Sequence, residues 1–235
     1  MNHTPNLSIL MRPFHLKMRA RKCPTLETRL TNGNTPERKL PKEANMNFEF
    51  AVALLQGETN IKMNTYVKLR DPVLQYVLSL FNDQPVKIFQ VGAIESLQTQ
   101  FRWGSGWSDT IFGGYIKQFG GSLTIVDIDL DHLANSCFMS ERLGYPINIQ
   151  LGDAIHSISS DYDIYYLDGA DGDVGDMQTL QQFKQIEHTS SVVLVDDITS
   201  KAVSLVKYLE SKNIDFNIHD VGNQGMITID MRREK

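Results

Sequence analysis

Residues 86–92 read VKIFQVG, and this stretch decides the fold. An apolar run of strand length, closed by a glycine, is typical of a strand buried inside a sheet. Gly92 lets the backbone turn tightly and approach a ligand where a Cβ would clash. We therefore predict a buried strand over Val86–Val91, with a ligand-accessible turn directly after it.

Working outward, short β-rich runs alternate with helical stretches, and this alternation predicts a parallel sheet covered on both faces. Two final runs joined by a glycine-bearing loop predict an antiparallel pair. We expect an α/β fold, Rossmann-like and doubly wound, with a mostly parallel seven-stranded sheet, an antiparallel C-terminal strand and three α/β/α layers. The predicted strands are Val86–Val91, Ser122–Ile128, Ile147–Gln150, Ile164–Leu167, Ser191–Val195, Phe216–His219 and Met226–Met231. The predicted helices are Asp109–Phe119, Leu130–Leu143, Met177–Glu187 and Lys201–Ser211.

Residues 1–45 differ from the rest of the chain in composition. They hold nine Lys and Arg against three Glu, and five of the eight prolines. We expect a basic, Pro-rich, disordered arm. A targeting peptide, a tether for an anionic partner and translation from an upstream start remain open.

Residues 46–85 carry a helical pattern and are interpreted as an N-terminal helical cap over the sheet edge or a pocket. Asp71-Pro72 predicts the start of the second helix of this cap, since proline is favoured in a first turn. Residues 86–235 then form the ligand-binding domain.

Composition excludes several classes of protein. Outside its arm the chain is strongly acidic, which disfavours general nucleic-acid binding. No apolar run approaches the roughly 20 residues of a membrane span. The two cysteines lack CxxC spacing, so we expect no disulfide or zinc site and a cytoplasmic location. A homodimer is left open.

Acidic side chains follow one predicted strand after another. Ligands of open parallel sheets bind beyond the carboxyl ends of the strands, so these acids mark the candidate site. Asp127 is placed to accept both hydroxyls of a ribose, and Asp153 to accept an adenine amino group. These features fit a nicotinamide dinucleotide as well as an adenosyl sulfonium. However, no GxGxxG fingerprint follows Gly92 to cradle a pyrophosphate.

Residues 86–231 resemble the class I S-adenosylmethionine-dependent methyltransferases, and among them the catechol O-methyltransferase-like branch. The matching stretches are VKIFQVG, GSGWSDTIF, GGSLTIVDID, LGDA, YDIYYLDGAD and VVLVDDI. The resemblance implies that Gly92 lies beside the methionine part of the cofactor and Ser108 near its carboxylate. It further implies that Asp127 holds the ribose, Asp153 and Ala154 the adenine rim, and Asp168 the amino group. The candidate cofactor residues are Gln90, Gly92, Ala93, Trp107, Ser108, Asp127, Asp129, Asp153, Ala154 and Asp168.

The chain departs from the family pattern at two places. Gln90 replaces an acid, which keeps hydrogen bonding but loses the charge. Residues 93–104 expand the short glycine loop and contain Glu95, Arg102 and Trp103. This insert is interpreted either as a lid or acceptor-binding loop, or as a surface excursion with Trp103 packed on the sheet.

In metal-dependent members of that branch, acids at the places of Asp168, Asp196 and Asp197 bind Mg²⁺, a cation that prefers oxygen ligands. The alternative is that Asp197 caps the following helix and Asp196 contacts the acceptor directly. Asp168 and Asp171 are the candidate catalytic residues. Methyl transfer from a sulfonium needs mainly alignment and desolvation, so a strong base is not obligatory.

The resemblance therefore implies a methyltransferase that uses S-adenosylmethionine, with Mg²⁺ as an optional second cofactor. The acid cluster favours an oxygen of a small-molecule acceptor. Two alternatives stay open: a non-catalytic S-adenosylmethionine-binding module, suggested by Gln90 and the altered loop, and a nicotinamide-dependent oxidoreductase, which the missing phosphate loop weakens.

Overall fold

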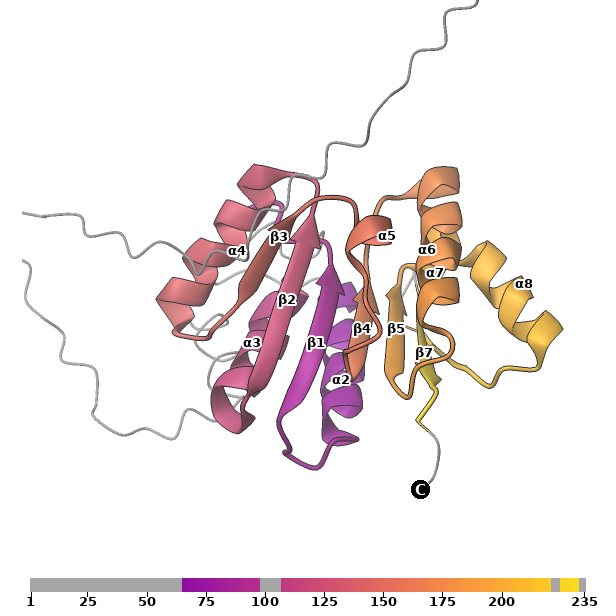
Figure 1. Ribbon diagram of the computed structural model, residues 1–235, viewed down its shortest axis with the longest axis horizontal. Coiled ribbons are helices and arrows are strands. Elements are labelled where there is room, and N and C mark those ends of the chain that lie inside the picture. Colours follow the sequence, from indigo (N-terminus) through magenta and orange to yellow (C-terminus); the bar gives the residue numbers. More distant parts are fainter. Residues whose placement is uncertain (1–64, 98–106, 221–224, 233–235) are drawn as a thin grey trace, which may run out of the picture.

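A computed structural model describes residues 65–97, 107–220 and 225–232, and shows one seven-stranded sheet with helices on both faces (Figure 1). The strand order is β3-β2-β1-β4-β5-β7-β6, in which β7 runs antiparallel to both of its neighbours. The fold prediction is confirmed, including the antiparallel C-terminal pair. The strands are β1 Val86–Val91, β2 Gly121–Asp127, β3 Asn148–Leu151, β4 Ile164–Leu167, β5 Val192–Asp196, β6 Asn217–His219 and β7 Met226–Asp230.

The helices connect the strands and cover the two faces of the sheet. One hydrophobic core lies under α2, α3 and α4, and the other lies under α5 to α8. The helices are α2 Thr65–Ser79, α3 Ser108–Phe119, α4 Leu130–Leu143, α5 Ala154–Ser157, α6 Gly172–Ile186, α7 Ile198–Lys201 and α8 Val203–Lys212.

Side-chain alternation along the strands decides which groups face which helices. On β4, Tyr165 and Leu167 belong to the core under α6, whereas Tyr166 belongs to the core under α2 and α3. Asp168 follows in the same alternation as Tyr166, and Asp196 at the end of β5 follows Leu194. Two acids at neighbouring strand ends are thereby directed to the α2 side of the sheet.

The predicted start of the cap helix at Asp71-Pro72 is wrong. Pro72 lies inside α2, which already includes Thr65. The apolar face of the helix, with Leu74 and Val77 fully buried, continues through the proline and packs on the core. Tertiary burial of this face outweighs the backbone hydrogen bond that proline removes.

The start of α6 also differs from the prediction, which placed it five residues later. The helix begins at Gly172, and Gly175 within it packs against the preceding loop, where a Cβ would lie 1.6 Å from the Ala170 carbonyl oxygen. Gly175 is therefore required for close packing inside the helix.

Several predictions fall on residues outside the described part of the chain: the basic arm at 1–45, the first part of the cap at 46–64, and Arg102 and Trp103 of the insert. Within the described residues, none of the helices combines the length and apolar character of a membrane span.

Candidate cofactor pocket and buried charge cluster

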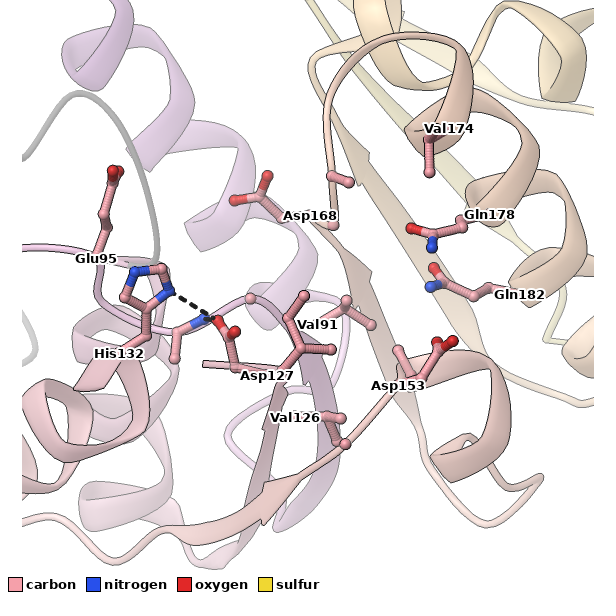
Figure 2. Close-up of a pocket in the computed structure, with 17 residues that line it drawn as sticks. Val91, Glu95, Val126, Asp127, His132, Asp153, Asp168, Val174, Gln178 and Gln182 are labelled. Carbon is pink, nitrogen blue, oxygen red and sulfur yellow. Dashed lines mark hydrogen bonds and ion pairs between the residues drawn. The ribbon is translucent and has the colours of Figure 1, made fainter. Parts of the chain in front are cut away.

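A cavity of about 490 Å³ opens at the carboxyl ends of β1, β2 and β4 (Figure 2). Its size suits a small organic ligand. Six of the ten candidate cofactor residues line it: Gly92, Ala93, Asp127, Asp153, Ala154 and Asp168. The strand-end acids that the sequence spreads over 42 positions therefore meet around one space, as the parallel topology predicts.

Gly92 makes the turn that ends β1. Its φ is +90°, and its amide donates to the carbonyl of Val126 at 2.9 Å. A Cβ at this position would lie 2.4 Å from the carbonyl oxygen of Asp168. The ends of β1 and β4 thus approach so closely that only glycine fits between them.

Asp127 is held at the end of β2 by backbone donors. Its Oδ2 accepts from the amide of Ala93 at 2.8 Å, and its Oδ1 accepts from the amide of Asp129 at 2.8 Å. His132 Nδ1 lies 3.4 Å from Oδ2 (Figure 2). Each carboxylate oxygen keeps acceptor capacity toward the cavity, so the group is fixed in position and able to receive two ligand hydroxyls.

Asp153 and Asp129 both sit at helix N-termini, but only Asp153 lines the cavity. The Asp153 carboxylate accepts from the amide of Ile155 at 2.9 Å and caps α5. Asp129 caps α4 by accepting from the amides of Asp131 and His132. Its side chain serves helix α4 and does not line the cavity.

Three further candidate cofactor residues are buried and do not line the cavity. Gln90 donates from Nε2 to the carbonyl of Gly92 at 2.7 Å, so it stabilises the turn after β1 without facing the cavity. Trp107 packs against Ile94 and Met139. Ser108 begins α3, and its buried hydroxyl has no hydrogen-bond partner among the described residues.

Lys201, on α7, is paired with the candidate catalytic acids. Its Nζ lies 2.5 Å from Asp168 Oδ1 and 3.3 Å from Asp171 Oδ1. Lys201 and Asp168 are buried, whereas the Asp171 side chain is 77% exposed. Burial raises the pKa of Asp168, and the ammonium opposes that rise. Burial lowers the pKa of Lys201, but the Asp168 carboxylate outweighs it and raises that pKa overall. This pairing favours the ammonium form of Lys201, which makes it a poor base.

Asp196 connects this pair to Arg70 on α2. Its Oδ2 accepts from the Tyr166 hydroxyl at 2.7 Å and lies 3.7 Å from Nη1 of Arg70, a fully buried residue of α2. The Tyr166 hydroxyl also lies 3.5 Å from Asp168 Oδ2. Two cations and two buried carboxylates thus face one another across the end of β4, with a tyrosine between them.

The predicted Mg²⁺ site is not supported. Asp168 is bound to an ammonium, and the Asp197 carboxylate accepts from the hydroxyls of Thr199 and Ser200 at 2.9 and 2.7 Å. No group of three or more His, Cys, Asp or Glu side chains suited to a metal occurs in the residues that the structure describes. The carboxylates are engaged by donors of the chain itself. Asp197 does occupy the N-cap position of α7, but its side chain makes no cap hydrogen bond there.

Four polar side chains that line the cavity were not among the candidate cofactor residues, although one of them belongs to the insert: Glu95, His132, Gln178 and Gln182. The two glutamines lie one turn apart on α6, and their amides point into the cavity (Figure 2). The spacing of Val174, Gln178 and Gln182 would have indicated one helix face, but only with the helix started at Gly172.

Asp109, the second residue of α3, carries a buried carboxyl whose ionisation opposes folding. Burial raises its pKa to about 8, against smaller lowering effects of Ser136, Thr110 and Arg70. A folded-state pKa above the unfolded value makes stability fall as pH rises between the two, by up to about 1.4 kcal/mol per pH unit. We expect Asp109→Asn to gain stability relative to the natural chain from pH 5 to pH 8. Urea unfolding at several pH values measures this difference, and parallel pH curves would contradict it.

Comparison with known proteins gives similarity of structure only. No family model matches the chain, and no curated protein does. Similar solved structures include a ribosomal protein L11 methylase from Lactobacillus delbrueckii subsp. bulgaricus, with 14% identity over 68% of this chain and 77% of that chain and a TM-score of 0.48. An RNA methyltransferase from Salinibacter ruber in complex with S-adenosyl-L-homocysteine has 15% identity, 70% and 93% coverage and a TM-score of 0.46. Fibrillarin from Aeropyrum pernix with bound S-adenosyl-L-methionine has 14% identity over 71% of this chain and 76% of that chain, with a TM-score of 0.46. With TM-scores below 0.5, these likenesses carry no functional weight, and the function is inferred from the site itself.

Proposed function

We propose that this chain binds S-adenosylmethionine in the cavity and transfers its methyl group to an oxygen of a small-molecule acceptor. The observation that carries the proposal is the meeting of the Gly92 turn, the Asp127 carboxylate and the Asp153 carboxylate around one cavity at the carboxyl edge of the sheet. An adenosyl ligand has a ribose diol and a base amino group that match these acceptors.

The residues fit this cofactor better than a dinucleotide. Asp127 would receive the ribose hydroxyls, and Gly92 leaves its backbone open to the amino-acid part. Asp168, at the same cavity, would receive the ammonium of that part. A pyrophosphate would instead meet three carboxylates, and the sequence after Gly92 has no GxGxxG motif to cradle it. When bound, the cofactor supplies an activated methyl group on a sulfonium.

An oxygen is proposed as the methyl acceptor because of the Lys201 ammonium near the cavity. Lys201 has three N–H donors, of which two contact Asp168 and Asp171. The third would hold an acceptor hydroxyl and lower its pKa, so that its proton leaves to solvent before the oxygen takes the methyl group from the sulfonium. The expectations of a small-molecule acceptor, no general nucleic-acid binding and a cytoplasmic location remain predictions.

Removing the ribose acceptor tests the site directly. We expect the natural chain to bind S-adenosylhomocysteine in the micromolar range, and Asp127→Ala to bind about a hundredfold more weakly, because charge-assisted hydrogen bonds contribute about 1.5–3 kcal/mol each. Isothermal titration measures both affinities. Asp131→Ala, an exposed acid four residues away, is the matched control. An unchanged affinity in Asp127→Ala, or no binding by the natural chain, would contradict the proposal. Tight NADH binding would favour an oxidoreductase.

A non-catalytic cofactor-binding module is the second candidate, because Asp168 is already paired with Lys201 and the resemblance places Gln90 where the family carries an acid. Incubation with S-adenosylmethionine and a panel of phenols and other hydroxylated acceptors, with and without Mg²⁺, separates the two. Accumulation of S-adenosylhomocysteine indicates catalysis, whereas cofactor binding without turnover for any acceptor favours the module.

A further inference from the structure

The cavity has an amide-lined floor on α6 that the ribose and amino-acid contacts leave unused. Val174, Gln178 and Gln182 succeed one another at intervals of one turn, and all three line the cavity. Val174 is 63% exposed at the rim and Gln182 only 2% exposed. The face of α6 therefore leads from the mouth of the cavity into its depth.

Gln182 is a polar side chain placed where water scarcely reaches. Neither its amide nor that of Gln178 has a hydrogen-bond partner among the residues that the structure describes. Both amides line the cavity, so a ligand that fills it would take them out of water and would have to satisfy their donors and acceptors. Both amides point toward the space beside Asp153 (Figure 2).

We propose that Gln182, assisted by Gln178, hydrogen-bonds the amino group and a neighbouring ring nitrogen of an adenine base, and so makes the cavity specific for adenosyl ligands. A carboxamide offers one acceptor and two donors in a plane, which match the adjacent donor and acceptor of an adenine edge. This inference rests on the proposed function, since it assigns the base of that cofactor to the α6 side of the cavity.

Neighbouring contacts hold this floor in place. Gln185, one turn farther along α6, donates from Nε2 to the carbonyl of Ile155 at 3.1 Å and ties α6 to α5. Asp153, at the N-terminus of α5, is thereby kept opposite the glutamines. The base would lie between a carboxylate and two amides, all of which offer an acceptor to the 6-amino group.

A four-way binding comparison tests the assignment. The ligands are S-adenosylhomocysteine and its purine analogue, which has hydrogen in place of the 6-amino group. The proteins are the natural chain and Gln182→Met, which keeps the length of the side chain without its amide. We expect the natural chain to prefer S-adenosylhomocysteine by about ten- to a hundredfold, and Gln182→Met to lose most of that preference.

Gln181→Met is the matched control, because Gln181 is the exposed neighbour on the same helix and should keep the natural preference. Gln178 is less buried than Gln182. If urea unfolding shows that Gln182→Met folds poorly, the ligand preference of Gln178→Met is measured instead. A natural preference retained in both Gln182→Met and Gln178→Met would overturn the inference, as would equal affinity of the natural chain for the two ligands. Failure of the natural chain to bind either ligand would instead contradict the proposed function.

Discussion

Gly92→Ala should abolish cofactor binding and lower the free energy of unfolding by about 3 kcal/mol or more. Two effects add. At a φ of +90° an L-residue is strained, and the new Cβ would lie 2.4 Å from the Asp168 carbonyl oxygen. That oxygen belongs to the backbone at the end of β4, so relief requires the strand end and the Asp168 carboxylate to move away from the cavity.

Gly172→Ala is the matched control for this prediction. Gly172 also has a positive φ, +69°, but nothing lies within 4 Å of a Cβ built there. It therefore carries the backbone strain without the collision, and should lose only about 1–2 kcal/mol and keep its affinity for S-adenosylhomocysteine. Urea unfolding and isothermal titration report the two quantities. Equal effects of the two substitutions would show that the close approach of β1 and β4 is unimportant.

Lys201→Met should destabilise the protein by about 3–5 kcal/mol, since it removes one partner of a buried ion pair and leaves the other without compensation. The Asp168 carboxyl would then have a pKa raised further above its unfolded value, because the opposing ammonium is gone. A group with a raised folded-state pKa loses stability as pH rises toward that value. The loss caused by Lys201→Met should therefore be smaller at pH 5 than at pH 8.

Two further proteins make this prediction specific. Lys207→Met changes an exposed lysine of α8 and should alter stability by less than about 0.5 kcal/mol. The double variant Lys201→Met with Asp168→Asn removes both charges. It should regain part of the lost stability, and the pH dependence added by Lys201→Met alone should disappear. A single variant that unfolds with the natural midpoint at both pH values would show that the ion pair does not hold α7 to the site.

The sheet was predictable because parallel strands buried on both faces appear as short apolar runs, and two of them, Val86–Val91 and Ile164–Leu167, were placed to the residue. The candidate site was predictable for a related reason. Parallel topology brings strand ends to one edge, so Asp127, Asp153 and Asp168 needed no distance information to be grouped.

Side-chain partnerships between distant elements were not predictable in the same way. Lys201 lies 33 positions from Asp168 in the sequence. Nothing in the sequence around Lys201 indicates that its ammonium takes the place predicted for Mg²⁺ at the strand-end acids. The glutamines of α6 were missed because the predicted helix started at Met177, after Val174, which left their shared helix face incomplete. Local propensity and tertiary packing disagree there, and packing decides the outcome.

The position of β7 has a consequence for how the molecule comes to exist in a cell. Met226–Asp230 is synthesised after every other strand, yet it pairs with β5 on one side and β6 on the other. While the ribosome still holds this segment, the nascent chain presents the open edge of β5, whose five residues are all buried in the finished protein. Such an edge invites pairing with other chains. Translational pauses or premature termination before residue 226 should therefore yield aggregated rather than merely inactive product.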